Sequence, residues 1–163
     1  MTDHDRAAPG HPFAAPMRLA LAQARAAAAR GETPVGAVIL DPRARVVAEA
    51  GNRTRELSDP TAHAEILALR AACAAAGSER LPGHAIFVTL EPCAMCAAAL
   101  AAARLARVIY AAPDPKSGGV YHGARIFDHP QSHHRPEVIA GLAEAEAAAL
   151  LRAFFAARRP SRD

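Results

Sequence analysis

The spacing of apolar residues changes from a helical to a strand-like pattern along the first half of the chain. From Met17 onward, an alanine-rich stretch is interrupted by polar residues at helical spacing as far as Gly31, which predicts an amphipathic helix. Two short apolar runs follow, at Val35–Leu40 and Arg45–Ala50, and the turn sequence Asp-Pro-Arg-Ala joins them. We therefore expect one helix followed by two antiparallel strands.

The second half of the chain continues this alternation. The predicted elements are a helix over Ala62–Ala76, a strand over Ala85–Leu90, a helix beginning at Pro92, a strand over Arg107–Ala111 and a helix over Gly141–Arg159. Since a helix separates the last two strands, they should be parallel neighbours. The pattern predicts a layered α/β sandwich with a mixed sheet, in which the helices at 62 and 92 both begin near the ends of strands.

Length and composition indicate a single compact domain. The chain has 163 residues, of which 52% are hydrophobic, and its composition shows no break between two units. We expect one domain over residues 17–159, flexible tails at 1–16 and 160–163, and no secretory signal in the polar segment 1–16. The charges within the first helix argue against a membrane span. A net charge of +3 and a pI near 9.1 are compatible with a polyanionic partner without requiring one.

Two cysteines after a predicted strand indicate a metal site. Cys93 and Cys96 lie three residues apart directly after Pro92, so a helix beginning there would place both thiols on one face of its first turn. The positive end of the helix dipole lies at this N-terminus and favours the thiolate forms that metals bind. The two thiols could therefore hold one ion.

A second predicted helix start supplies a histidine and a carboxylate. The segment Asp59–Ala62 leads directly into His63-Ala64-Glu65, so His63 can reach the same ion as a third ligand. Three protein ligands are typical of catalytic zinc sites, which leave the fourth position to water and lower its pKa to about 7. Glu65 would take a proton from that water and return it to a ring nitrogen and then to a leaving amine. This combination predicts a zinc enzyme that hydrolytically deaminates a nucleobase.

Other interpretations of these residues remain. The cysteines could be buried thiols or a thioredoxin-like redox pair, and the metal could be a structural clip in a nucleic-acid-binding module. A zinc ribbon needs a second cysteine pair, whereas Cys73 is the one remaining cysteine. A redox pair would leave His63 and Glu65 without a role, so we favour the deaminase. Three cysteines, two of them on a metal, also indicate a reducing compartment, and we expect the cytoplasm.

These motifs resemble those of a known superfamily. The His-x-Glu and Pro-Cys-x-x-Cys patterns are similar to those of the zinc-dependent, cytidine-deaminase-like enzymes. Within that superfamily, the chain resembles the bacterial tRNA-specific adenosine deaminases most closely, through four segments. These are Thr33–Val38, Gly51–Arg53, Asp59–Ile66 and Val88–Cys93. The resemblance extends over Met17–Arg159 and implies a three-layer α/β/α sandwich with a mixed sheet of about five strands.

The resemblance also implies a reaction, a substrate and a cofactor. In that family, a water held by one zinc ion per subunit attacks C6 of the wobble adenosine in the anticodon stem-loop of an arginine tRNA, and the product is inosine. The enzyme is a homodimer. The metal ligands carried over to this chain are His63, Cys93 and Cys96, the proton shuttle is Glu65, and Asn52 is the amide that hydrogen-bonds the flipped nucleotide.

Four further substrate contacts follow from the resemblance, each with a structural alternative. Lys116 and Asp114 match a loop along the anticodon strand, where they would meet a phosphate and a ribose hydroxyl, but a solvated turn is an equal alternative. Phe155 matches a helix end beside the substrate, although of the adjacent phenylalanines 154 and 155 only one should face the site. Val35 would pack against the base, with strand core as its default position.

The chain departs from the family at several positions. Ala98 and Ala111 stand where the family often has glycine, and the segment Lys116–His122 differs from better-known versions of the loop. A deaminase of a free nucleobase or nucleoside, of the guanine or cytosine type, is the alternative function. It would use the same zinc and Glu65.

Four histidines lie close together in the second half of the chain. They are His122, His129, His133 and His134. Because acidic ligands are lacking nearby, we interpret them as surface or dimer-contact residues and not as a second metal site.

Overall fold

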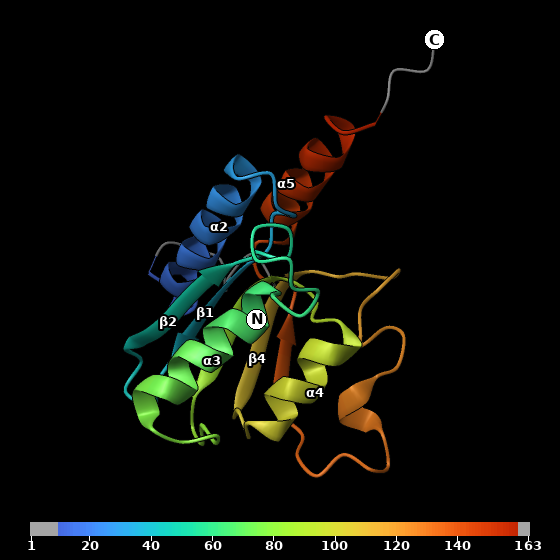
Figure 1. The fold of residues 1–163 in the computed structure, drawn as a ribbon. Coiled ribbons are helices and arrows are strands. Elements are labelled where there is room, and N and C mark those ends of the chain that lie inside the picture. The colour runs from blue at the N-terminus through green and yellow to red at the C-terminus, as the bar shows by residue number, and fades with distance from the viewer. Residues whose placement is uncertain (1–9, 160–163) are drawn as a thin grey trace.

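The structure, a computed structural model, describes residues 10–159 and has three layers with one sheet in the middle (Figure 1). The sheet has five strands in the order β2-β1-β3-β4-β5. The elements are α2 (Ala14–Ala29), β1 (Gly36–Leu40), β2 (Val46–Gly51), α3 (Ala64–Ala76), β3 (Ala85–Leu90), α4 (Ala94–Ala102), β4 (Arg107–Ala112), the 3-10 turn η1 (Ile126–Asp128), β5 (Glu137–Ala140) and α5 (Glu144–Ala156). The predicted α/β/α sandwich with a mixed sheet is confirmed.

The strand directions agree with the lengths of the connections. β1 pairs antiparallel with β2, to which a short turn joins it, and also with β3. β3 and β4 are parallel because α4 crosses between them, and β4 is also parallel to β5. β5 is the strand that the apolar pattern did not reveal. It has four residues, none of them fully buried, so it lacks the continuous apolar run that marks β1, β3 and β4.

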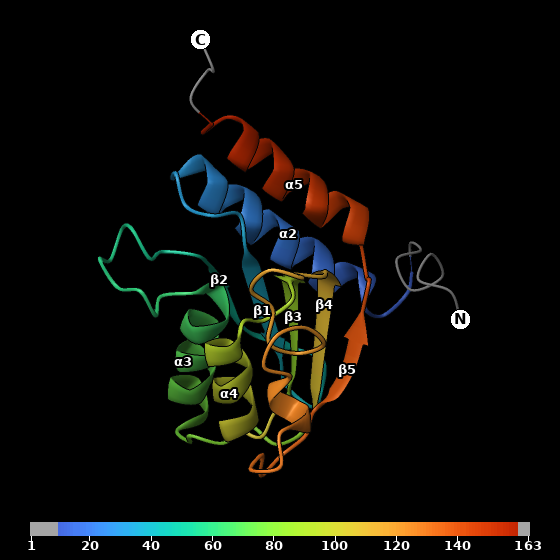
Figure 2. The same cartoon turned by 90° about the vertical axis from the view of Figure 1, so that its right-hand side faces the viewer.

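The two faces of the sheet carry different pairs of helices. Helices α2 and α5 lie on one face, and α3 and α4 cover the other (Figure 2). The buried layer under α2 and α5 includes Leu21 and Phe87. The layer under α3 and α4 includes Leu69, Leu100 and Val88. Burial of a large apolar side chain contributes roughly 1.5–3 kcal/mol, so these two layers hold the helices against the sheet.

Helix α2 lies close to the sheet because two paired glycines face it. Gly36 of β1 pairs with Gly51 of β2. A Cβ atom at Gly36 would lie 1.9 Å from the carbonyl oxygen of Ala20, and one at Gly51 would lie 2.8 Å from that of Gln23. The absence of side chains at these two positions therefore sets the distance between helix and sheet.

The helix boundaries differ from the sequence expectation by a few residues. α2 begins at Ala14 instead of Met17, and α5 spans 144–156 instead of 141–159. Gly141 and Ala143 have φ angles of 89° and 60°, and this left-handed backbone delays the start of α5. Of the predicted tails, 1–16 and 160–163, residues 1–9 and 160–163 lie outside the described residues, whereas residues 14–16 belong to α2. Within the described chain, no helix is both long and apolar enough to cross a membrane.

Candidate active site

The two helices that carry the motifs begin at the same end of the sheet. β2 and β3 are both antiparallel to β1, and the first residues of β1, Gly36 and Ala37, pair with Gly51 and Val88 near the ends of β2 and β3. The chain leaves β2 toward α3 and β3 toward α4 from this shared end. The convergence of the two helix starts that the sequence predicted is therefore present.

The first metal-ligand candidate of each motif is the N-cap residue of its helix. His63 precedes α3 and Cys93 precedes α4, both with extended backbone, and neither side chain makes a capping hydrogen bond. The predicted helix starts at 62 and 92 were therefore two residues early. An N-cap side chain that does not cap is free to reach another partner. Cys96, the third residue of α4, lies on the same helix face as Cys93.

The three donor atoms have the spacing of zinc ligands. Nδ1 of His63 lies 3.7 Å from Sγ of Cys93 and 3.6 Å from Sγ of Cys96. In tetrahedral zinc, with Zn–S about 2.3 Å and Zn–N about 2.0 Å, nitrogen and sulfur ligands are roughly 3.6 Å apart. Within residues 10–159, His63, Cys93 and Cys96 are the only group of three or more such side chains that could hold a metal ion. The donor set fits one zinc ion with three protein ligands.

Without a metal ion, the thiol of Cys93 favours the ionised state and that of Cys96 the protonated state. The hydrogen bond from Cys96, supported by His63, lowers the pKa of Cys93 to about 4. The same contact with Cys93, together with burial, raises the pKa of Cys96 far above its usual range. The two sulfurs lie within 4.8 Å of each other, so two thiolates would repel, and a divalent cation between them would allow both to ionise.

Glu65 is a buried carboxylate with an unused acceptor. It is the second residue of α3 and is 4% exposed. Its Oε2 is fully buried and has no hydrogen-bond partner within residues 10–159. Burial raises the pKa of Glu65 to about 7. A group with that pKa can accept and release protons near neutral pH, which suits a proton shuttle.

Asn52 joins the end of β2 to the start of α3. Its Oδ1 accepts the N–H of Ala64 at 2.9 Å, and its backbone N–H donates to the carbonyl of Val35 at 3.1 Å. Because Oδ1 is already used, Nδ2 is the part of the amide that remains to donate to a ligand. Val35 is 6% exposed and belongs to the core layer under α3 and α4. Asn52 and Val35 therefore lie next to the helix start that carries His63.

The structure adds a buried glutamate that the sequence interpretation missed. Glu91 follows β3 directly and lies two residues before Cys93, and its side chain is 0% exposed. Its carboxylate accepts hydrogen bonds from the backbone N–H groups of Asp114, Val120, Tyr121 and His122 and from Nδ1 of His122. Burial opposes ionisation, but these donors outweigh it and hold the pKa of Glu91 below its usual value. The signal in the sequence was an acidic residue between an apolar strand and Pro92.

Asp114 and Lys116 lie on a tight turn. Oδ1 of Asp114 accepts the N–H groups of Lys116 and Ser117 at 3.2 and 3.0 Å, and its carbonyl accepts the N–H of Gly118 at 2.8 Å. Lys116 is exposed. The turn that was the structural alternative is therefore present, and a contact with substrate stays a prediction for both residues.

Phe155 lies on the other face of the sheet. It belongs to α5, which packs against α2, β3 and β4, whereas α3 and α4 cover the opposite face (Figure 2). Phe154 is 9% exposed and Phe155 is 49% exposed, so the first is a core residue and the second is accessible. The structure does not bring Phe155 together with the three metal-ligand candidates.

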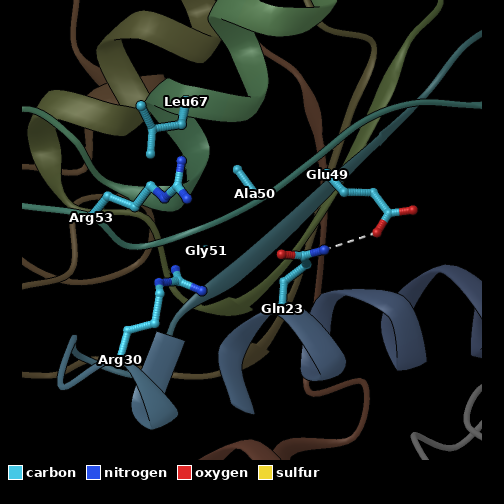
Figure 3. Close-up of a pocket in the computed structure, with 7 residues that line it drawn as sticks. All are labelled: Gln23, Arg30, Glu49, Ala50, Gly51, Arg53 and Leu67. Carbon is cyan, nitrogen blue, oxygen red and sulfur yellow. Dashed lines mark hydrogen bonds between the residues drawn. The ribbon is translucent and has the colours of Figure 1, made fainter. Parts of the chain in front are cut away.

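A cavity of about 340 Å³ lies between α2, β2 and α3 (Figure 3). Its lining comprises Gln23, Arg30, Glu49, Ala50, Gly51, Arg53 and Leu67. Arg30 and Arg53 both pair with Glu56, at 3.7 and 3.1 Å, and Gln23 donates to Glu49 at 3.0 Å. None of the predicted site residues is among these lining residues. This cavity is therefore distinct from the group around His63.

Three of the four clustered histidines have individual partners. Nδ1 of His122 lies 2.7 Å from Oε2 of Glu91, and Nε2 of His134 lies 2.6 Å from the carbonyl of Leu105. Nδ1 of His129 accepts the N–H of Gln131. Within the described part of the chain, these histidines form no group that could hold a metal. Their role as dimer contacts stays a prediction.

Comparisons with known proteins agree with this geometry. Residues 14–112 match the family model of the cytidine and deoxycytidylate deaminase zinc-binding region. The chain is also 57% identical over 144 residues to a tRNA-specific adenosine deaminase from Agrobacterium fabrum, an alignment that covers 88% of this chain and 93% of the relative. The chain belongs to this family of zinc-dependent deaminases. Zinc as the cofactor and deamination as the reaction class are thereby confirmed.

Two solved structures place this deaminase among its relatives. One comes from studies of A-to-I editing by tRNA:A34 deaminases at the wobble position of transfer RNA. It is 55% identical, has a TM-score of 0.82 and covers 84% of this chain and 99% of that chain. The other is a guanine deaminase from Nitrosomonas europaea, which is 27% identical with a TM-score of 0.70 over 87% of this chain and 84% of that chain. The deaminase fold is therefore shared with enzymes that act on different purines.

Proposed function

We propose that this deaminase converts adenosine to inosine at the wobble position of a tRNA anticodon. The reaction type is supported by the three donors of His63, Cys93 and Cys96 with the buried Glu65 close by. The choice of substrate is supported by the relative from A. fabrum, which is 57% identical and is named a tRNA-specific adenosine deaminase. An unpaired anticodon base can be extruded into such a site at a low cost in unstacking.

Glu65 carries both proton transfers of the proposed reaction. A zinc ion, when bound by the three ligands, supplies a water that is acidic enough to act as a nucleophile near neutral pH. Oε2 of Glu65 would accept a proton from the attacking water, whose oxygen bonds to C6, and would donate this proton to N1 of the adenine. Glu65 would then deliver the second proton of the water to the amine, and the bond between C6 and the amine nitrogen breaks. Adenosine and water thus become inosine and ammonia, and Glu65 returns to its starting state.

The substrate contacts proposed for the chain come from several elements. Nδ2 of Asn52 would donate to the flipped nucleotide, and Val35 would form part of the wall behind the base. Asp114 and Lys116 would meet a ribose hydroxyl and a phosphate of the anticodon strand. Phe155 would border the RNA from α5. The position of Asn52 directly after β2 supports its proposed contact with the nucleotide. The turn at 114–118 is held by Glu91, which directly follows β3, and this supports the proposed contacts of Asp114 and Lys116.

Four further properties belong to the same proposal. Residues 17–159 form a single catalytic domain, the substrate is an arginine tRNA, the enzyme is a homodimer, and it works in the cytoplasm. Three free cysteines suit a reducing compartment. Size-exclusion chromatography with light scattering tests the oligomeric state, and a mass of one chain would contradict the dimer.

Inosine formation in RNA tests the proposed reaction. The purified zinc protein is incubated with an arginine tRNA anticodon stem-loop, with the same stem-loop carrying guanosine at the wobble position as control, and the nucleosides are analysed. Wild type should produce inosine only from the first RNA. Glu65→Gln should keep its zinc but react at least about 100-fold more slowly, because the proton shuttle is lost. Inosine from Glu65→Gln at the wild-type rate would exclude Glu65 as the shuttle.

Deamination of free guanine is the second candidate function. It is supported by the 27% identical guanine deaminase, whose fold this chain shares over most of its length. Release of ammonia from guanine, without inosine in the RNA, would favour this alternative over editing.

A further inference from the structure

We propose that Glu91 is a positioning residue for the RNA substrate, because its buried carboxylate fixes the segment Asp114–His122 beside the metal ligands. This inference rests on the proposed function. The segment is irregular in structure, yet it follows β4 at the end of the sheet where α4 begins. Its conformation therefore decides which side chains are presented next to the metal centre.

The hydrogen bonds of Glu91 converge from both ends of the segment. Oε2 accepts the N–H of Asp114 at 2.9 Å and lies 2.7 Å from Nδ1 of His122. Oε1 accepts the N–H groups of Val120, Tyr121 and His122 at 3.3, 2.9 and 3.0 Å. One carboxylate thus closes a loop whose two ends are separated by the turn at Lys116. A neutral side chain of the same shape cannot accept all five bonds.

Close packing against Glu91 and the start of α4 also restricts the position of the segment Asp114–His122. A Cβ atom at Gly118 would lie 2.5 Å from Cδ of Glu91, and one at Gly119 would lie 2.4 Å from the backbone nitrogen of Ala94. The N–H of Gly119 donates to the carbonyl of Pro92 at 2.8 Å, and Gly118 forms an isolated bridge with Cys93. The segment is therefore held directly against the start of α4, and Glu91 fills the space beneath it.

The side chains that this arrangement leaves outside are suited to RNA. Lys116 and Tyr121 are exposed, and the side chain of His122 is 37% exposed. Because Nδ1 of His122 faces Glu91, Nε2 on the far side of the ring remains for another partner. A lysine, an imidazole and an aromatic ring are groups that contact phosphates and bases in single-stranded RNA. A buried polar network whose members are all hydrogen-bonded makes the local conformation rigid, and this supports a positioning role for Glu91.

Asp41 provides a matched control at the far end of the sheet. It too is a buried carboxylate that holds a turn, because Oδ1 accepts the N–H groups of Arg43 and Arg45 at 2.9 Å each. This turn connects β1 to β2 at the end opposite Gly36. Asp41→Asn therefore repeats the chemical change of Glu91→Gln away from the metal centre.

The test measures KM and kcat for the stem-loop at one fixed salt concentration, together with zinc content, for wild type and three variants. For Glu91→Gln we expect KM to rise about tenfold while kcat changes less than about threefold and zinc stays at the wild-type level. His122→Ala, which removes one of the five bonds at a partly exposed position, should raise KM in the same direction by about threefold. Asp41→Asn should leave KM and kcat unchanged.

The outcomes separate this inference from the function on which it rests. Inosine formation by wild type with an unchanged KM in Glu91→Gln overturns the positioning role alone. A fall in zinc or kcat without a change in KM also overturns it, because Glu91 would then support the metal ligands instead. An equal rise of KM in Asp41→Asn would show a general loss of stability and would overturn it as well. If Glu91→Gln does not fold, Gly118→Ala decides by the same criterion, because its Cβ atom would lie 2.5 Å from Cδ of Glu91 and displace the carboxylate. Absence of inosine with wild type removes both proposals.

Discussion

His63 and Cys93 occupy N-cap positions without capping the helices that follow them. A side-chain oxygen at such a position contributes about 1 kcal/mol to the stability of a helix, and α3 and α4 lack this contribution. Their side chains converge on one position where a shared cation would bind, so the free energy of metal binding would also stabilise the start of α3 and of α4. Metal loss should therefore affect the fold as well as the reaction.

Replacement of one ligand tests this coupling. Cys96→Ala should lose zinc and lower the melting temperature by more than about 5 °C, because the binding free energy is linked to folding. Cys73→Ala is the control, since Cys73 is a free cysteine outside the ligand group and its replacement should keep the zinc. Elemental analysis and thermal unfolding measure the two effects. Equal zinc in both variants would contradict the ligand assignment.

Glu32 allows a test of pH dependence away from the metal. It is 1% exposed, and although burial opposes ionisation, the N–H groups of Glu56 and Arg55 lower its pKa below the ordinary 4.5. A group whose pKa is lower in the folded state stabilises the protein above its unfolded pKa and loses that contribution as pH falls through the folded pKa. The stabilisation by Glu32 should thus be complete above about pH 4.5.

Glu32→Gln should lower the free energy of unfolding by about 2 kcal/mol at pH 7, and the difference should shrink as the pH falls below about 4.5. Glu79→Gln is the control, because Glu79 has an 86% exposed side chain and its replacement should change stability by less than about 0.5 kcal/mol. Urea unfolding at several pH values measures both. A difference for Glu32→Gln that grows on acidification would exclude this explanation.

At the scale of elements, α2 is placed by the two glycines that face it. Gly36→Ala would put a Cβ atom 1.9 Å from the backbone oxygen of Ala20, so α2 must move away from β1. We expect a loss of about 3 kcal/mol in the free energy of unfolding, since overpacking against a backbone cannot relax by a rotamer change. Chemical denaturation measures this loss. A stability equal to that of the wild type would show that α2 can shift without cost.

The elements differ in how well their apolar pattern predicts them. β3 spans 85–90 both in the sequence expectation and in the structure, because it is buried on both faces and forms a continuous apolar run. β5, at the sheet edge, has no such run and was not assigned to a range. α3 and α4 begin two residues later than expected. The N-cap residues are the metal-ligand candidates His63 and Cys93, whereas the prediction began the helices at Ala62 and Pro92.

At the scale of the whole molecule, the metal motifs and α5 lie on opposite faces of the sheet (Figure 2). A contact between Phe155 and the RNA therefore requires the substrate to extend past the edge of the domain or a second subunit to bring the two faces together. The adjacent phenylalanines allow this to be tested, because Phe154 is buried and Phe155 is accessible.

Phe154→Ala should lower the free energy of unfolding by about 3 kcal/mol, since it leaves a cavity in the core. Phe155→Ala should leave stability within about 0.5 kcal/mol of the wild type but raise KM for the stem-loop. Thermal unfolding and steady-state kinetics on the two variants measure these effects. An unchanged KM for Phe155→Ala would remove Phe155 from the proposed substrate contacts.

The sequence by itself determined the three ligand candidates, the carboxylate beside them, the order of most helices and strands along the chain, and the layered architecture. These features depend on spacing within one helix turn and on the periodicity of apolar residues, which are local in the chain. Tertiary structure alone decided that Glu91 holds the segment Asp114–His122, that Oδ1 of Asn52 is taken by Ala64, and that Phe155 lies on the other face. The hydrogen bonds of Glu91 join residues 23 to 31 positions apart, and no local pattern specifies a contact across that separation.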